Sequence, residues 1–392
     1  MANPLVANEG VLLHLVDFVN DQQYLFFAPV STTWNKAWGM RPKITRAVMA
    51  HTTVTQLAKS FSCGLPYRGA VLEAAASLGR LDLLRFARGY GCPWPDELYS
   101  KAAEGGHVDV IAWARYSGCP LKKNICDVAA RAGQISTIKW AYTQGFTSGK
   151  KTCGEAALGG HLAIIQWLRS NGCPWDEQTC FGCARGGHLS ALQWVREHGC
   201  PWNAATCYGA ARGGHVDVLQ WARANGCSWD QQTCYNAAVG GHLELLMWAH
   251  RNGCPWDEGT CYGAAAAGHL GVLQWARSAG CPWHEHTSLA AAYSGHLAML
   301  QWLVANGCPW NEATCAKAAQ GGHLDVLRWA HENGCPWDTL TCFFAAGEGH
   351  LTVLKWARAN GCPWDAQTVE IARKKGHSDV DAWARANGCP EP

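Results

Sequence analysis

The apolar and polar positions of this chain follow a pattern that repeats at a constant interval along most of the sequence. In residues 176–202, one apolar group begins after Asp176, a residue type that caps helix N-termini, and ends at Gly186–Gly187. A second group begins at His188 with helical spacing and ends at Gly199, a residue type that closes helices. Each repeat is therefore predicted to form two short helices.

A glycine–histidine pair marks the same position in successive repeats. Histidine follows glycine at His107, His161, His188, His215, His242, His269, His296, His323, His350 and His377. Gln134 fills the one gap and Arg80 opens the series, so twelve repeats run without insertion or deletion. Helices this short are marginal alone, and a strict period is typical of units that stack on one another. We expect an all-α solenoid over residues 64–392, in which each histidine bonds backbone groups of its own or the previous turn.

The repeat resembles the ankyrin repeat. The shared features are Thr206 at the start of helix one, Ala210–Ala211, Gly214–His215, an apolar second helix, and Gly226–Cys227 at its end. The repeat has 27 residues, whereas an ankyrin repeat has about 33, and most of the loss falls in the ankyrin β-hairpin loop. The resemblance implies ankyrin-like helix pairs with short turns. It also implies that the turn before helix one and the free face of that helix line a concave binding surface.

Residues 1–45 differ from the repeats and contain a segment, Val11 to Trp34, that resembles an F-box. The resemblance assigns adaptor docking to Leu12, Leu15, Val16, Phe18, Tyr24, Leu25 and Trp34. F-box proteins dock on the Skp adaptor of cullin–RING ubiquitin ligases, so it implies a ligase subunit whose repeats hold the substrate. The alternative is a helical cap that shields the first repeat. Residues 46–63 are expected to form a linker or N-terminal cap.

The charge balance gives no reason to expect nucleic acid or a membrane as a partner. The chain has 32 basic and 30 acidic residues and a formal net charge of +2. No run approaches the roughly 18 apolar residues of a membrane span, and the N-terminus does not resemble a secretory signal. We expect a monomer in the cytoplasm or nucleus.

The 21 cysteines fall mainly at two positions of the repeat, which argues against disulfides and metal sites. Equivalent cysteines of neighbouring repeats should lie about 8–10 Å apart. A disulfide needs Cα atoms about 4.4–6.8 Å apart, and zinc needs four ligands around one point. Cys180 and Cys183 form the only closely spaced C-x-x-C pair. We predict reduced, buried cysteines and no metal site.

Tryptophan recurs at two positions, one in the predicted second helix and one after the Cys-Pro turn, as in Trp221 and Trp202. Tryptophan is common at binding hot spots. Its presence in nearly every repeat nevertheless favours packing, because each interface between repeats needs the same filler. We expect both series to pack within the stack, with the indole N–H groups needing hydrogen-bond partners.

Positions that differ between repeats are the candidates for partner binding. Counting the threonine of each helix one as zero, positions two and six share a helix face, and aromatic and arginine side chains are frequent anchors. The predicted partner-binding residues are Phe181, Arg185, Tyr208, Arg212, Tyr235 and Tyr262, with Glu177, Gln178, Gln231, Gln232 and Glu258 before Thr. The alternative is a solvated face with relaxed constraint.

Residues 115–151 depart most from the repeat pattern. They carry seven basic residues and one acid, Asp127; the basic residues are Arg115, Lys122, Lys123, Arg131, Lys139, Lys150 and Lys151. This segment is predicted to be either a patch for an acidic partner or an eroded repeat.

Motif content points away from catalysis. The chain has no G-x-S-x-G, H-E-x-x-H or phosphate-binding glycine loop, so we predict no catalytic residue and no cofactor. The sequence favours a non-enzymatic scaffold for protein–protein interaction. The finer hypothesis is a substrate-recognition subunit of a cullin–RING ligase, and the alternative is a stand-alone ankyrin-type binding or anchoring protein with no ubiquitin link.

Overall fold

A computed structural model describes residues 52–62, 69–120 and 124–391. All seven residues of the predicted adaptor-docking set lie outside these ranges. The chain divides into two compact units, with the boundary between Thr179 and Cys180. The domain boundaries predicted at residues 45 and 63 stay predictions, because they fall outside the described residues.

Every regular element of the described residues is an α-helix, which confirms the predicted all-α fold. In the first unit, α4 (Val54–Ser62) precedes helix pairs in which odd numbers are helix one and even numbers helix two. They are α5 (Gly69–Ser77), α6 (Leu81–Gly89), α7 (Leu98–Glu104), α8 (Val108–Tyr116), α9 (Ile125–Arg131), α10 (Ile135–Thr143), α11 (Lys150–Leu158) and α12 (Leu162–Ser170). The next helix, α13 (Glu177–Gly186), spans the boundary.

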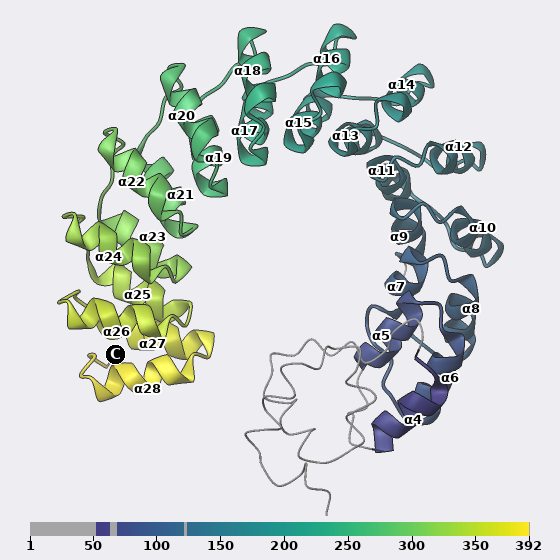
Figure 1. Cartoon of the computed structure of the whole chain (residues 1–392), viewed down its shortest axis with the longest axis horizontal. Helices are drawn as coiled ribbons and strands as arrows, with labels where there is room; N and C mark the ends of the chain where they lie inside the picture. The colour runs from purple at the N-terminus through teal and green to yellow at the C-terminus, as the bar shows by residue number, and fades with distance from the viewer. Residues whose placement is uncertain (1–51, 63–68, 121–123, 392) are drawn as a thin grey trace, which may run out of the picture. The chain divides into compact units, whose positions relative to one another are not determined.

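The second unit continues the same alternation. Its helices are α14 (Leu189–Glu197), α15 (Ala204–Gly213), α16 (Val216–Ala224), α17 (Gln231–Gly240), α18 (Leu243–Arg251), α19 (Glu258–Ala267), α20 (Leu270–Ser278), α21 (Glu285–Tyr293), α22 (Leu297–Ala305), α23 (Glu312–Gly321), α24 (Leu324–Glu332), α25 (Thr339–Gly347), α26 (Leu351–Ala359), α27 (Ala366–Lys375) and α28 (Ser378–Ala386). Within this unit the odd-numbered helices form an inner row and the even-numbered helices an outer row (Figure 1).

Local chemistry explains why the helices begin and end where the sequence predicts. The Asn203 side chain accepts a hydrogen bond from the Ala205 backbone N–H at 2.9 Å, so it caps α15. Gly214 closes that helix with φ of 78°, in the left-handed region that favours glycine. A Cβ atom on Gly214 would also lie 2.6 Å from the His242 ring. Glycine at this position therefore allows both the left-handed turn and the close approach of the next repeat.

The core lies between the two rows and is built from small residues on helix one and larger aliphatic residues on helix two. In one repeat, Cys207, Ala210 and Ala211 from α15 are buried with Val218 and Leu219 from α16. The prediction of buried cysteines is confirmed, since every cysteine in the described residues is buried and free of disulfides.

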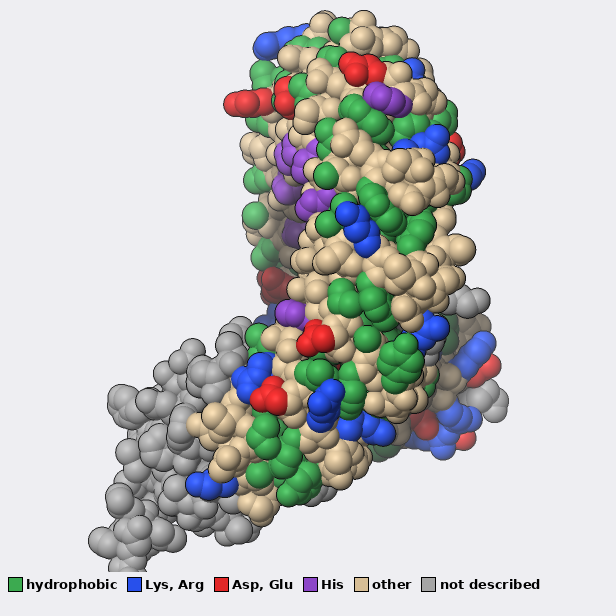
Figure 2. All heavy atoms as spheres, turned by 90° about the vertical axis from the view of Figure 1, so that its right-hand side faces the viewer, with side chains coloured by type: hydrophobic (Ala, Val, Ile, Leu, Met, Phe, Trp, Pro, Cys, Tyr) green, Lys and Arg blue, Asp and Glu red, His purple; other side chains and the backbone are tan. Residues whose placement is uncertain are grey.

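Six of the repeated histidines are hydrogen-bonded to the preceding repeat of the same unit. His215 Nε2 lies 3.2 Å from the Arg185 carbonyl oxygen, and His242 Nε2 lies 3.2 Å from that of Arg212. The predicted contact with the histidine's own turn is wrong, because the imidazole reaches back 30 residues to the end of the preceding helix one. Histidine side chains follow one another along the face seen in Figure 2.

A substitution at His215 tests this link. We expect His215→Ala to lower the free energy of unfolding by about 1–2 kcal/mol, because the Arg185 carbonyl loses its partner. His215→Gln should retain most of the stability, because Gln134 already performs this role by donating from Nε2 to the Glu104 carbonyl at 3.1 Å. Urea unfolding followed by circular dichroism measures both variants. Equal losses in the two would argue against the hydrogen bond.

In the second unit, the turn tryptophan of one repeat packs against the helix-two tryptophan of the next, in agreement with the predicted packing within the stack. The Trp202 and Trp221 rings meet edge to face with centroids 5.8 Å apart, and equivalent pairs recur through the second unit. The Arg196 guanidinium lies 4.1 Å from the Trp202 ring centroid and donates to the Cys200 carbonyl. This contact fixes the turn between repeats with a cation–π interaction.

Candidate functional site

The predicted row of aromatic residues lies along the helix-one elements of the second unit, with one residue on each helix. Phe181, Tyr208 and Tyr235 are half-buried, whereas Tyr262 is exposed over 38% of its surface. The Phe181 and Tyr208 ring centroids lie 5.9 Å apart at an interplanar angle of 61°. The aromatic side chains of this row are therefore most exposed to solvent at its α19 end.

The half-buried rings pack against the next repeat. A Cβ atom on Gly209 would lie 2.9 Å from the Phe181 ring, and one on Gly263 would lie 3.1 Å from the Tyr235 ring. The glycines leave room for these rings to lie across the neighbouring helix one. Phe181 and Tyr235 consequently contribute to packing as well as to the surface.

The two predicted arginines flank this row and are both exposed. Arg185 lies one turn after Phe181 on α13, and its Cζ atom lies 6.0 Å from the Phe181 ring centroid. Arg212 occupies the equivalent position on α15. Arg185 thus presents a positive charge beside an aromatic ring.

The polar residues predicted before helix one lie at the N-terminal ends of their helices. Gln178, Gln231, Gln232 and Glu258 are exposed, and Glu177 is half-buried. Glu177 and Gln178 precede the boundary between the units, whereas the other three belong to the second unit. The exposed members of this set are available to a partner.

A groove of about 320 Å³ opens on the same face between α19, α21 and α23. Its lining includes Tyr262, Leu289, Tyr293 and Lys317, and Tyr293 is exposed over 50% of its surface. Of the predicted partner-binding residues, only Tyr262 lines this groove. Phe181, Tyr208 and Tyr235 lie further along the row.

Lys317 gives the groove a positive charge held among aromatic rings. Its Nζ lies 5.8 Å from the Tyr293 ring centroid and 5.4 Å from that of Phe344. The same ammonium donates to Gln320 Oε1 at 2.8 Å. No carboxylate pairs with Lys317 in the part of the chain that the structure describes. The groove can therefore accept an apolar or aromatic group beside a negative one.

Sequence reasoning missed Tyr293 and Lys317 as site residues. Tyr293 lies at the variable position six of its helix and could have been selected by the same argument that selected Tyr262. Lys317 lies at position three, where other helix-one elements carry the glycines Gly182, Gly209 and Gly263. A lysine at a position that is glycine in three other repeats was the available signal.

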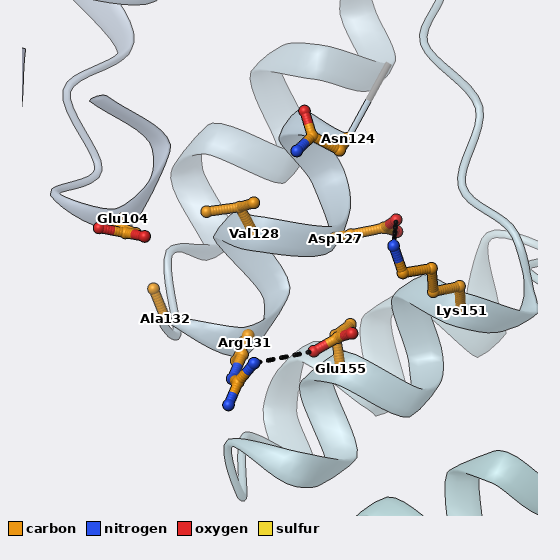
Figure 3. Close-up of a pocket in the computed structure, with 8 residues that line it drawn as sticks. All are labelled: Glu104, Asn124, Asp127, Val128, Arg131, Ala132, Lys151 and Glu155. Atoms are coloured by element: carbon orange, nitrogen blue, oxygen red, sulfur yellow. Dashed lines mark ion pairs between the residues drawn. The ribbon is translucent and has the colours of Figure 1, made fainter. Parts of the chain in front are cut away.

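The basic segment in the first unit is partly neutralised by nearby carboxylates. Lys151 Nζ lies 3.3 Å from an Asp127 carboxylate oxygen, and an Arg131 guanidinium nitrogen lies 3.9 Å from one of Glu155 (Figure 3). These residues line a cavity of about 370 Å³. The mixed signs around it make this cavity a weaker candidate than the groove for a charged partner.

Metal-binding clusters and membrane-spanning helices are both absent from the described residues. Within residues 52–62, 69–120 and 124–391, no group of three or more histidine, cysteine or acidic side chains is placed to hold a metal ion. Over those same ranges no helix combines the length and apolar character that crossing a membrane requires.

Comparisons with known proteins show a similarity to ankyrin repeats in one part of this chain. A family model described as ankyrin repeats (many copies) matches residues 288–331, and no curated protein matches. The human ASB11 ankyrin repeat domain is similar at 16% identity and a TM-score of 0.36, over 45% of this chain and 96% of that chain. The pentatricopeptide repeat protein PPR10, in complex with an 18-nt psaJ RNA element, is similar at 14% identity and a TM-score of 0.34, over 97% of this chain and 63% of that one. Residues 288–331 thus match the ankyrin repeat model, and such repeats indicate a scaffold for protein–protein interaction.

Proposed function

We propose that this scaffold holds one extended protein segment along the helix-one face of its second unit, anchored in the groove between α19, α21 and α23. The observation that carries the proposal is the groove itself, with Tyr262 and Tyr293 exposed beside Lys317. Apolar side chains that gather in an exposed groove mark interaction sites, and aromatic residues supply much of the energy at binding hot spots. The positive charge favours a segment in which an apolar or aromatic side chain adjoins a carboxylate.

Affinity capture identifies the partner and tests the site together. Wild-type full-length chain and a Tyr262→Ala, Tyr293→Ala variant are used as paired baits, and captured proteins are compared by mass spectrometry. A partner of this face should be enriched on the wild type and depleted on the variant. If every captured protein binds both baits equally, the groove is not the binding site.

From the F-box-like segment we also infer a more specific function. The chain would be a substrate-recognition subunit of a cullin–RING ubiquitin ligase. Its support is the resemblance of residues 11–34, in which Leu12 and Leu15 match apolar positions of the F-box docking segment. A substrate held on the repeats would then be presented to the ligase. The stand-alone binding protein is the alternative, and the two differ in whether the chain binds an Skp adaptor.

Charge substitution in the docking helix distinguishes these alternatives. We expect Leu12→Glu with Leu15→Glu to abolish co-purification of the adaptor. Burying one polar group without a hydrogen bond costs roughly 2–7 kcal/mol, and an unpaired carboxylate costs more. Circular dichroism should show that the repeats keep their helical content. The F-box inference fails if wild-type chain does not bind the adaptor or if the variant binds it equally well.

A further inference from the structure

Seven repeats place two thiols side by side, one on helix one and one further along the chain, in the turn after helix two. The pairs are Cys153–Cys173, Cys180–Cys200, Cys207–Cys227, Cys234–Cys254, Cys261–Cys281, Cys315–Cys335 and Cys342–Cys362. The Cys153 and Cys173 sulfur atoms lie 3.5 Å apart. In the other six pairs the two cysteines occupy the same two repeat positions, 20 residues apart. These pairs were not predicted from the sequence, because their members lie at different positions of the repeat.

The backbone holds the second cysteine of a pair in place. Cys227 Sγ donates to the Asn203 carbonyl at 3.3 Å, and Cys281 Sγ donates to the Asp257 carbonyl at 3.3 Å. That carbonyl belongs to the residue that caps helix one. The sulfur pair therefore lies where the start of helix one meets the turn after helix two.

The two thiols of a pair differ in acidity. The hydrogen bond from the Cys207 thiol lowers the pKa of Cys227, and the Arg223 charge lowers it further, although burial opposes both effects. That hydrogen bond, together with burial, raises the pKa of Cys207. The second cysteine is consequently the one that more readily forms a thiolate, which is the form that reacts with oxidants.

We propose that these thiol pairs are oxidation sites at which hydrogen peroxide forms one disulfide in each of these seven repeats. The thiolate of the second cysteine attacks the peroxide O–O bond, which gives a sulfenic acid and, after proton transfer, water. The first cysteine then attacks the sulfenic sulfur and releases a second water. In sum, two thiols are oxidised to a disulfide and one peroxide is reduced to two waters.

Geometry confines the reaction to the pairs. In the Cys153–Cys173 pair the sulfur separation of 3.5 Å must shorten to the roughly 2.05 Å of a disulfide. Thiols at equal positions of neighbouring repeats are separated by about the 8–10 Å of helix packing. Because the cysteines are buried, the oxidant reaches them during local opening of the turn.

The chain contains its own matched controls, in which one member of the pair is replaced. Cys308 Sγ lies 3.2 Å from Ser288 Oγ, so a hydroxyl replaces the first thiol. Cys389 packs beside Val369, and the Tyr99 hydroxyl donates to the Cys119 carbonyl. These three cysteines are buried in equivalent turns but lack a partner thiol at the helix-one position.

Disulfide mapping tests the proposal on the full-length protein. Reduced native chain is treated with hydrogen peroxide, the remaining thiols are alkylated, and non-reduced peptides are identified by mass spectrometry. We expect cross-links between the two cysteines of each pair, with both thiols of a pair lost together, and none that involve Cys308 in wild type. Circular dichroism during the treatment should show that the helices remain folded.

A variant that gains a thiol pair provides the more decisive test. Ser288→Cys should create a new 288–308 cross-link, while Cys207→Ser should remove the 207–227 cross-link and leave Cys227 alkylated. The proposal is overturned if the folded wild type forms no disulfides or mainly forms cross-links between cysteines at equal positions of neighbouring repeats. It is equally overturned if Cys308 of the wild type cross-links as fast as the paired cysteines. The wild-type map alone decides if either variant fails to fold.

Discussion

Truncation of Trp221 to alanine is expected to lower the free energy of unfolding by roughly 3 kcal/mol, at the lower end of the range for large aromatic side chains. Trp221 is half-buried and meets Trp202 with ring centroids 5.8 Å apart. Its removal exposes that ring and leaves a void between the turn and α16. Loss of the edge-to-face contact adds to the cost of lost burial.

Urea unfolding of Trp221→Ala, with Gln220→Ala as the control on the same helix, measures this effect. Gln220 is exposed, so its truncation should change stability by less than about 0.5 kcal/mol. A double-mutant cycle with Trp202→Ala should give a coupling energy of about 0.5–1.5 kcal/mol. Near-equal stability of Trp221→Ala and Gln220→Ala would mean that the tryptophan series does not support the stack.

One degenerate repeat shows how the same contact survives sequence change. Ser148 stands where most repeats have the turn tryptophan. The Tyr142 ring instead meets Trp167, with centroids 4.9 Å apart at an interplanar angle of 75°. A large aromatic ring against the helix-two tryptophan is therefore retained, although it comes from another position.

The helix pairs could be predicted from the sequence because their signals are local. Asn203 and Gly214 mark the ends of α15 through interactions with nearby residues in the chain, so the repeating pattern is enough to place them. The fold class followed from repetition, since helices of 9 or 10 residues need neighbours.

Contacts between different positions of the repeat could not be predicted in the same way. The His215 link reaches a carbonyl 30 residues earlier. The Cys207–Cys227 pair joins helix one to the turn after helix two. Comparing equal positions of successive repeats shows which residues recur, but it does not show which positions are in contact. The groove was missed for the same reason, since Lys317 and Tyr262 come from helices two repeats apart.

The structure also separates the predicted aromatic row into two parts with different expected behaviour. Phe181 and Tyr235 lie against glycines of the next repeat, and Tyr208 meets the Phe181 ring. We therefore expect Tyr208→Ala with Tyr235→Ala to reduce stability as well as partner binding. The groove residues Tyr262 and Tyr293 are more exposed, and their main contribution should be to binding.

Tyr262→Ala with Tyr293→Ala is accordingly expected to weaken partner binding by over about 2 kcal/mol, or roughly 30-fold, because it removes both exposed rings that line the groove. The melting temperature should barely change, since these rings already contact water over 38% and 50% of their surfaces. Calorimetric titration with the captured partner, beside thermal unfolding of the same variants, separates the two effects. Tyr208→Ala with Tyr235→Ala serves as the comparison and should lower the melting temperature. If the groove variant loses stability but its folded fraction binds as wild type does, these tyrosines are packing residues and the partner binds elsewhere.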